Sequence, residues 1–447
     1  MATMIRKLYS LLMWAAQPFL RRKLIRRGQV EPGYLEAVDE RFGFYTQAPE
    51  VRSELVWVHA VSLGETRTAG ILLKALRERL PALRILLTHG TATGRVEGVS
   101  LLREGDVQVW QPWDSEAAVA RFFAHFQPRL GILLETEVWP NSVACAQARG
   151  VPLALVNARL SDKSLQQALR MAPLSRPAYA ALAAVYAQTQ DDARRLRSLG
   201  ATVQHVFGNL KFDAAPDAAQ YAQGKQWRLA LARPVLMLAS SREGEEESFL
   251  ERISAPALSV QAQDATKTVA DADSAETSVV AVFQILIVPR HPQRFDEVCA
   301  LVEKRGLSVS RRSNWNGGPP LAADVWLGDS LGEMALYYAM SDVALLGGSF
   351  APLGGQNLIE AAACGCPVMM GPHTFNFAEV AELAEAAGAA RRALDMADAV
   401  RNAKALLTRP TAQHAAAAAS LQFAAQHRGA TANTAQALAS LLNGDGD

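Results

Sequence analysis

The sequence predicts an α/β fold of two successive domains, each with a parallel sheet covered by helices on both faces. From Glu54 onward, short apolar runs of strand length alternate with longer runs of helical pattern, which is typical of parallel sheets. After Lys211 the same alternation starts again. In the segment 343–370, an apolar run ends in two glycines, and a second glycine pair precedes a helix. We therefore expect two Rossmann-like domains that face each other across a cleft.

The chain of 447 residues is half apolar and one-fifth charged, as in an ordinary globular enzyme of two or three domains. Its net charge of +1 is unevenly distributed, because the first 30 residues carry seven basic and no acidic side chains. This predicts an anionic surface as the partner of the N-terminus and argues against a broad nucleic-acid interface. The four cysteines form no CxxC pair, and we expect reduced core thiols of a cytosolic compartment.

Residues 1–30 form a basic segment around the short apolar stretch Tyr9–Leu20. This stretch contains Pro18 and is too short for a membrane-spanning helix, which needs ~20 apolar residues. The RRKLIRR that follows is unlike the small residues of a signal-peptide cleavage site. We expect an amphipathic helix, with Trp14 and Phe19, that lies in the headgroup region of the cytoplasmic leaflet. The alternative is an ordinary first helix docked on the core.

The first domain is expected at residues 31–215, with strands at LVWVHA, RILLTH, VQVWQP, LGILLE, PLALVN and AVYAQT. The second is expected at residues 216–425, with strands at VLMLAS, QILIVPR, DVWLGD, VALLGG and PVMMG, followed by a C-terminal helix and tail at 426–447. Residues 254–279 are rich in Ala, Ser, Thr and Asp without periodicity, so we expect a mobile surface insertion with no catalytic role.

The first strand leads into Val61-Ser-Leu-Gly-Glu65, immediately before a helix. Ligands of open α/β sheets bind at the carboxyl ends of the strands. At that edge Gly64 lets a substrate approach and Glu65 can accept a proton. The alternative is that Ser62 and Glu65 form only a capping box at the start of the helix.

The fourth strand ends in LLETEVWPN, which brings Glu135 and Glu137 to the same edge. Two carboxylates one residue apart point to opposite sides of an extended chain, so we expect only one to enter the cleft. Polar residues also follow neighbouring strands, in THGTATGR (88–95), NARLSDKS (157–164) and GNLKFD (208–213). Their convergence at one edge favours a catalytic site.

In the second half, a basic turn and a glycine-rich turn also follow strands. Arg290 and His291 can donate hydrogen bonds to a phosphate. Gly354 and Gly355 precede a helix expected to start near Asn357, with Glu360 in its first turn. Glycine backbone and a helix N-terminus suit an anion, and a carboxylate can accept hydrogen bonds from ribose, so we predict a nucleotide site. The alternatives are a solvated basic turn and a glutamate that caps its own helix.

As a set, these motifs resemble those of the 3-deoxy-D-manno-octulosonic acid (Kdo) transferases, which are GT-B glycosyltransferases of lipopolysaccharide assembly. The matching motifs occur in order over residues 5–425 and are RFGFY, VSLGE, LLETEVWPN, NARLSDKS, GNLKFD, LIVPRHPQRF, LGEMALYYAMSD and GGQNLIEAAACGCPV. The main departure is the segment 254–279, which falls between motifs. The resemblance implies inverting transfer of Kdo from CMP-Kdo to a lipid A precursor (lipid IVA), at the cytoplasmic face of the inner membrane of a Gram-negative bacterium.

The resemblance also implies a role for individual residues. Glu65 is then the general base, with an ordinary pKa, and Glu135 and Lys211 stabilise the charges of the transition state. Lys211 can also pair with the Kdo carboxylate. The implied CMP-binding residues are Arg290, His291, Leu331, Gly332, Glu333, Asn357, Leu358, Ile359 and Glu360. Further substrate-binding residues are Ser62, Gly64, Arg95, Asn157 and Arg159.

No metal or other cofactor is expected, because CMP has a single phosphate that Arg290 and helix N-termini can neutralise, and no DxD pair ends a strand. The expected partners are CMP-Kdo, a lipid A precursor and anionic lipids of the inner membrane, without nucleic acid. Two alternatives remain: another GT-B enzyme that uses a UDP-sugar, and a non-catalytic membrane scaffold with this fold. The intact set of candidate catalytic residues argues against the scaffold.

Overall fold

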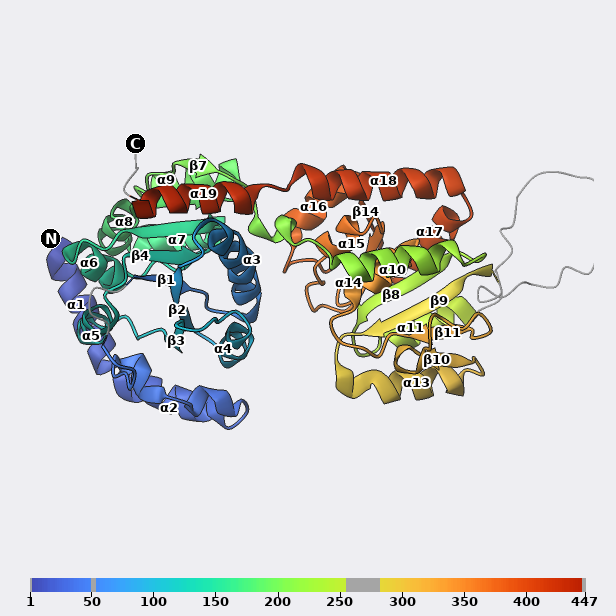
Figure 1. Cartoon of the computed structure of the whole chain (residues 1–447), viewed down its shortest axis with the longest axis horizontal. Helices are drawn as coiled ribbons and strands as arrows, with labels where there is room; N and C mark the ends of the chain where they lie inside the picture. Colours follow the sequence, from blue (N-terminus) through green and yellow to red (C-terminus); the bar gives the residue numbers. More distant parts are fainter. Residues whose placement is uncertain (1, 50–53, 255–281, 444–447) are drawn as a thin grey trace, which may run out of the picture. The chain divides into compact units, whose positions relative to one another are not determined.

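In the computed structural model, which describes residues 2–49, 54–254 and 282–443, the chain forms two compact units (Figure 1). Unit 1 comprises Met1–Asp213 and His427–Asp447, and unit 2 comprises Ala214–Gln426. Each unit contains a 7-stranded sheet in which all neighbouring strands are parallel, so the predicted α/β class is confirmed. The predicted insertion at 254–279 lies outside the described residues, apart from Ser254.

In unit 1 the strand order is β3-β2-β1-β4-β5-β6-β7. The strands are β1 (Leu55–His59), β2 (Arg84–His89), β3 (Val107–Trp110), β4 (Leu130–Leu134), β5 (Leu153–Ala158), β6 (Ala184–Ala187) and β7 (His205–Val206). The α-helices are α1 (Ala2–Ala15), α2 (Gln17–Gly28), α3 (Leu63–Arg79), α4 (Ala92–Val99), α5 (Glu116–Phe126), α6 (Pro140–Ala148), α7 (Asp162–Arg170), α8 (Ala172–Ala180), α9 (Gln190–Ser198) and α19 (Ala430–Asn443), and the short 3-10 turns are η1 (Pro32–Leu35), η2 (Val38–Phe42) and η3 (Leu210–Asp213). All six strands predicted for the first half are present.

The two faces of this sheet bury different side chains, because successive residues of a strand point to opposite faces. Trp57 of β1 packs with Phe122 and Phe123 of α5 on one face. Val56 and Val58 pack on the other face, with residues of α3 and α19. The C-terminal helix therefore completes the core of unit 1.

In unit 2 the strand order is β10-β11-β9-β8-β12-β13-β14. The strands are β8 (Val235–Ser241), β9 (Gln284–Pro289), β10 (Val309–Arg311), β11 (Val325–Leu327), β12 (Val343–Leu346), β13 (Val368–Met370) and β14 (Ala390–Arg392). The α-helices are α10 (Ala218–Leu229), α11 (Glu245–Ser254), α13 (Phe295–Lys304), α14 (Met334–Ala339), α15 (Ile359–Ala363), α16 (Ala378–Ala386), α17 (Met396–Leu407) and α18 (Pro410–Gln426), and the 3-10 turns are η4 (Pro292–Arg294) and η5 (Arg312–Asn314). The five strands predicted for the second half are present.

All four cysteines are free. Cys364 and Cys366 are buried in unit 2, as expected of core thiols, whereas Cys145 and Cys299 are only half-buried. Burial raises the pKa of Cys364 to about 12, which keeps this thiol protonated and unreactive.

Candidate functional site

Each sheet has one strand beside which the strand order reverses. In unit 1, β1 lies between β2 and β4, and in unit 2, β8 lies between β9 and β12. Ligands of open α/β sheets bind outside the carboxyl ends of the strands at this position. Most of the predicted site residues follow β1, β8 or the strands beside them.

Glu65 forms the predicted capping box at the start of α3. Its backbone N–H donates to Ser62 Oγ at 3.3 Å, and its carboxylate accepts hydrogen bonds from Ser62 Oγ at 3.0 Å and from the Val61 N–H at 2.8 Å. The capping alternative is therefore correct as a description of the contacts. Each carboxylate oxygen retains a further acceptor position, so capping does not exclude proton transfer.

The environment makes Glu65 a stronger base than an ordinary glutamate. Burial, together with the charges of Glu135 and Glu137, raises its pKa, although hydrogen bonds from Val61 and Ser62 oppose this effect. The sequence-based expectation of an ordinary pKa is therefore wrong. Burial is the largest cause, and the two carboxylates that add to it are distant in sequence and reach Glu65 only through the fold.

Glu135 is almost fully buried, with 3% of its surface exposed, and is held between two cations. Its Oε1 lies 3.1 Å from Lys211 Nζ, and its Oε2 lies 2.7 Å from Arg159 Nε. Its backbone is left-handed, with φ 59°, which costs a non-glycine residue roughly 1–3 kcal/mol and is concentrated at functional sites. The fold thus brings together three of the predicted residues.

Both acidic residues after β4 act on Glu65 through their charges, and which of them enters the cleft stays a prediction. The left-handed backbone of Glu135 starts a turn, and the chain does not alternate as an extended strand does. Glu137 accepts a hydrogen bond from Trp139 Nε1 at 2.8 Å and lies 3.8 Å from His59 Nε2. Burial raises the pKa of Glu137, but hydrogen bonds from His59, Trp139 and Thr136 outweigh it and lower the pKa. His59, the last residue of β1, was missed because its strand reads as uniformly apolar.

Asn157 anchors the loop that carries Lys211. Its Oδ1 accepts a hydrogen bond from the Leu210 N–H at 3.0 Å, and its backbone oxygen accepts one from Gln188 Nε2 at 2.9 Å. Gln188 also accepts from Asn209, whose own Oδ1 accepts from the Lys211 N–H at 3.0 Å. The buried Asn157 Nδ2 has no hydrogen-bond partner in the described part of the chain.

Ser62 and Gly64 lie beside Glu65, whereas Arg95 is engaged elsewhere. A side chain at Gly64 would meet no atom closer than Ser62 Oγ at 4.0 Å, so the space above it is open. Arg95 Nη1 binds Glu40 Oε2 at 2.9 Å, and its guanidinium lies over the Trp110 ring. These contacts join Arg95 to η2 and to β3, and its role in substrate binding stays a prediction.

In unit 2, basic residues gather where β8 and β9 end. Arg290 and His291 follow β9, and the Arg290 N–H donates to Ser241 O of β8 at 3.0 Å. Burial and the nearby charges of Arg242, Arg290 and Arg294 lower the pKa of His291. This concentration of positive charge suits a phosphate group. Arg242, which follows β8, was not singled out from the sequence although it occupies the same kind of strand end.

The glycine-rich loop after β12 is ordered by a carboxylate of the protein itself. Glu245 accepts hydrogen bonds from the N–H groups of Gly348 (2.8 Å), Phe350 and Ala351 (both 3.2 Å). The anion-binding turn predicted from Gly354 and Gly355 also has an internal contact, because the Gly355 N–H donates to Gly348 O at 2.8 Å. Hydrogen bonds within the protein therefore hold this loop in place.

The helix expected near Asn357 begins two residues later, at Ile359, because Asn357 Oδ1 accepts a hydrogen bond from the Ile359 N–H at 3.0 Å. Glu360 does lie in its first turn. Burial raises the pKa of Tyr338, and the charge of Glu360 raises it further while that of Arg290 lowers it. Glu360 and Arg290 therefore both act on the same buried tyrosine through their charges, which is consistent with one shared nucleotide site.

Leu331, Gly332 and Glu333 form the turn before α14, as predicted. Leu331 is exposed, and Gly332 is left-handed with φ 77° and open space around it. Glu333 Oε1 binds Arg312 Nη2 at 2.8 Å. The Glu333 side chain is thus fixed, and the Gly332 carbonyl accepts a hydrogen bond from Gln220 Nε2 at 2.9 Å. Leu358, in contrast, is buried.

The N-terminal helix α1 docks on unit 1 through polar contacts and exposes its apolar side chains. Ser10 Oγ donates to Asn141 Oδ1 at 3.0 Å, and Tyr9 hydrogen-bonds Asp114. Figure 1 shows α1 and α2, in dark blue, along the outside of unit 1. Trp14 and Phe19 are 65% and 70% exposed. Of the helices that the structure describes, none is long and apolar enough to cross a membrane.

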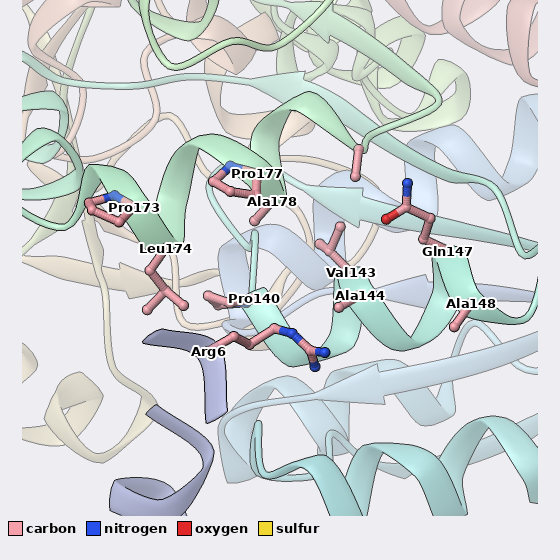
Figure 2. A pocket seen from close by; sticks show the side chains of 11 residues that line it. Arg6, Pro140, Val143, Ala144, Gln147, Ala148, Pro173, Leu174, Pro177 and Ala178 are labelled. Carbon is pink, nitrogen blue, oxygen red and sulfur yellow. The ribbon is translucent and has the colours of Figure 1, made fainter. Parts of the chain in front are cut away.

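A separate hollow of about 380 Å³ lies between α1, α6 and α8. Figure 2 shows Arg6 reaching along α6 opposite Pro173, Leu174 and Pro177 of α8. No predicted site residue lines this hollow, so it does not belong to the strand-end sites. The described residues contain no group of three His, Cys, Asp or Glu side chains placed to hold a metal ion.

Comparison with known proteins identifies related sequences and folds. Residues 36–214 match the family model described as 3-deoxy-D-manno-octulosonic-acid transferase. The chain is 46% identical over 440 residues to the transferase of that name from Bordetella pertussis (97% of this chain, 98% of that protein). It is 30% identical over 384 residues to the one from Haemophilus influenzae, covering 84% of each chain.

Solved structures show similarity of fold at low sequence identity. A glycosyltransferase from Rickettsia africae matches with a TM-score of 0.52 at 10% identity, over 88% of this chain and 99% of that one. The UDP-GlcNAc 2-epimerase from Neisseria meningitidis matches with a TM-score of 0.52 at 14% identity, over 87% and 99%.

Proposed function

This chain belongs to the Kdo transferase family, and on that premise we propose that it transfers Kdo from CMP-Kdo to a sugar hydroxyl of a lipid A precursor. Its α/β fold is of the GT-B type that the motifs implied. The observation that carries the proposal is the group of Glu65, Glu135, Lys211 and Arg159 at the switch point of unit 1.

The reaction begins with the acceptor. Glu65 takes the proton of the acceptor hydroxyl, whose oxygen attacks the anomeric carbon of Kdo. The bond from that carbon to the phosphate oxygen breaks, and CMP leaves with the electron pair. Attack opposite the leaving group inverts the anomeric carbon. Hydrogen bonds from Val61 and Ser62 orient the Glu65 carboxylate for this transfer.

Glu135, Lys211 and Arg159 set the charge around the base. The negative charge of Glu135 raises the pKa of Glu65 and so strengthens it as a base. The contacts with Lys211 and Arg159 fix the position of the buried Glu135 carboxylate. Lys211 and Arg159 also place two cations beside these carboxylates, where they can stabilise negative charge that develops during transfer.

Unit 2 supplies the donor site in this proposal. Arg290 and His291 bind the phosphate, and Glu360 accepts hydrogen bonds from the ribose. The backbone of residues 331–333 and 357–359 contacts the cytosine base. Charge neutralisation by arginine serves the departing CMP, and the proposed mechanism therefore needs no metal.

The experiment combines purified full-length protein with lipid IVA and either CMP-Kdo or UDP-sugars, with products identified by mass spectrometry. Transfer from CMP-Kdo alone supports the proposal. Transfer from a UDP-sugar would instead identify a different GT-B enzyme. Absence of both transfer and nucleotide binding would leave the scaffold alternative.

The location at the cytoplasmic face of the inner membrane is part of the proposal. It is supported by the exposed apolar face of α1 and by a hollow of about 660 Å³ on α2. The residues that line this hollow are Phe19, Arg22, Lys23, Arg26, Arg27, Val30 and Glu31. Four cations beside two apolar side chains suit the phosphate headgroups and upper acyl region of anionic lipids.

A further inference from the structure

Arg242 lies at the switch point of unit 2, between the two halves of the proposed nucleotide site. It follows β8 directly. On one side of β8 is β9, which leads to Arg290, and on the other is β12, which leads to the glycine-rich loop and Glu360. Arg242 thus occupies the central strand end, where ligands of such sheets bind.

The backbone at the end of β8 is irregular in a way that directs this side chain. Pairing with β9 shifts register between Ala239 and Ser241, and Ser240 is left-handed with φ 51°. Bulges and left-handed non-glycine residues cluster at functional sites, where a bulge re-aims the following side chain. The Arg242 N–H then donates to Glu245 Oε2 at 2.9 Å, which fixes the start of the side chain.

The side chain of Arg242 lies beside the glycine-rich loop. A Cβ added at Gly348 would lie 3.7 Å from Arg242 Cγ and 3.3 Å from Gln356 Nε2. On the other side, the preceding residue Ser241 accepts the Arg290 N–H. The Arg242 side chain therefore lies beside the loop after β12, and its backbone neighbour Ser241 is hydrogen-bonded to Arg290.

Arg242 and Arg294 both act on His291 through their charges, but they differ in their ion pairs within the part of the chain that the structure describes. Arg294 is paired with Glu246 at 2.7 Å and with Glu297 at 3.0 Å. In contrast, no acidic side chain forms an ion pair with the Arg242 guanidinium within the described residues. An unpaired guanidinium beside Arg290 suits a second anionic group next to the phosphate.

The proposed donor carries two anions on one carbon. The anomeric carbon of Kdo bears both the carboxylate and the bond to the phosphate, so the two groups are adjacent. Lys211, the carboxylate partner expected from the sequence, is already paired with Glu135 at 3.1 Å. The donor chemistry therefore calls for two neighbouring cations in unit 2, and Arg242 and Arg290 are at neighbouring strand ends.

We propose that Arg242 binds the carboxylate of the donor sugar acid while Arg290 binds the phosphate, so that Arg242 selects a sugar-acid nucleotide over a nucleotide of a neutral sugar. This inference rests on the proposed function. Arg242 is then a specificity-determining residue and not a catalytic one. It contacts the carboxylate, which neutral sugars lack, whereas the bond that breaks is the one to the phosphate.

The test compares intact donor with CMP in the full-length protein. Arg242→Gln removes the charge and keeps hydrogen-bond donors. It should lower kcat/KM for CMP-Kdo on the order of tenfold or more, as for loss of a charged hydrogen bond. The Kd of CMP, measured by calorimetry, should stay within about twofold, because CMP lacks the carboxylate. Arg242→Lys, which keeps the charge without bidentate geometry, should be intermediate. Arg252→Gln on α11 is the matched control for a lost positive charge and should resemble the wild type.

Three outcomes overturn parts of this account separately. Equal losses for CMP and CMP-Kdo would move Arg242 to the phosphate and overturn the carboxylate assignment. Unchanged kcat/KM for CMP-Kdo in Arg242→Gln would show that Arg242 does not bind the donor. Wild-type protein that neither binds CMP nor transfers Kdo would instead refute the proposed function. Thermal unfolding of each variant identifies a folding defect, in which case Arg242→Lys, which keeps the positive charge and the aliphatic part of the side chain, carries the comparison.

Discussion

The Glu65 carboxylate caps a helix and is the proposed base, and these two roles respond differently to substitution. In Glu65→Gln, the amide oxygen can still accept the Val61 N–H, and the amide nitrogen can donate to Ser62 Oγ. The amide cannot take a proton from the acceptor. We expect turnover to fall by ~10²–10⁴, the range for general base catalysis, with nearly unchanged thermal unfolding and CMP affinity.

A matched control exists in unit 2. Asp395 accepts the Asp398 N–H at 2.8 Å, and the Asp398 carboxylate accepts the Leu394 N–H at 3.1 Å, which reproduces the capping geometry of α3. Asp398→Asn should therefore leave turnover unchanged. If Glu65→Gln also retains near-normal turnover, capping alone explains Glu65 and the base is another residue.

The raised pKa of Glu65 predicts the acid limb of the pH profile. The base acts only when ionised, so kcat/KM should fall as the pH drops through a value above that of an ordinary glutamate. Glu137→Gln removes one of the negative charges that raise this pKa and leaves the Lys211–Glu135 pair intact. The limb should then move to lower pH. A shift to higher pH, or none, would contradict the assignment of this limb to Glu65.

A substitution at Gly64 distinguishes an effect on stability from an effect on turnover. A methyl group here meets no protein atom within ordinary contact distance, and Ala is favoured over Gly within a helix by up to about 1 kcal/mol. Gly64→Ala should therefore keep or slightly raise the melting temperature. Turnover should nevertheless fall several-fold if the acceptor approaches over this position. Normal turnover would remove Gly64 from the substrate site.

At the scale of elements, the exposed face of α1 predicts membrane binding. Leu8, Leu11 and Leu12 are all more than half exposed and recur at helical spacing. Replacing all three with Gln removes apolar area worth ~0.8 kcal/mol per buried methylene. Sedimentation with anionic liposomes and transfer to membrane-embedded acceptor should both decrease, while CMP binding survives.

The basic residues of α2 allow a second test of membrane binding, by reversal of charge. Arg21 is spared, because it lies 4.0 Å from the Phe42 ring centroid and 3.8 Å from Asp39. Arg22→Glu with Lys23→Glu should weaken liposome binding, and high salt should partly mimic this effect. Leu394→Gln, an exposed apolar residue of unit 2, is the control and should change nothing. Normal binding in all variants would mean that α1 and α2 are only docked structural helices.

The sequence predicts strands well where they are buried on both faces. The runs around Trp57 and Leu345 are continuously apolar, because helices cover both sides of these strands. The strands missed were β7, β10 and β14, which have only two or three residues each and lie at or near sheet edges. Exposed polar residues such as His205 and Arg391 interrupt any apolar run that a sequence pattern could detect.

For the molecule as a whole, the sequence predicts which strand ends carry polar side chains. It does not predict with which residues these side chains form ion pairs and hydrogen bonds. Glu135 and Lys211, both expected at the site, are 76 residues apart and form an ion pair that the motifs did not predict. Arg95 instead pairs with Glu40, and Glu245 binds the glycine-rich loop across 103 residues. Such choices depend on three-dimensional packing between segments that no local spacing encodes.

The division of the chain into two units predicts which variants will lose affinity for CMP and which will keep it. Arg290 and Glu360 belong to unit 2, while Glu65 and Lys211 belong to unit 1. CMP lacks the transferred sugar, so its affinity should depend on the first pair alone. Arg290→Ala or Glu360→Ala should each weaken CMP binding by about 1.5–3 kcal/mol, the cost of losing a hydrogen bond to a charged group.

The same calorimetry on the unit 1 variants completes this argument. Glu65→Gln and Lys211→Ala should bind CMP like the wild type although their turnover is low, because they act on the acceptor and on the transition state. Arg252→Ala, an exposed cation on α11, controls for the change in net charge of unit 2. Unaltered CMP affinity in both Arg290→Ala and Glu360→Ala would remove the nucleotide from the strand ends of unit 2. Loss of CMP affinity in Lys211→Ala would show that unit 1 also binds the nucleotide, so that the two units do not divide donor from acceptor.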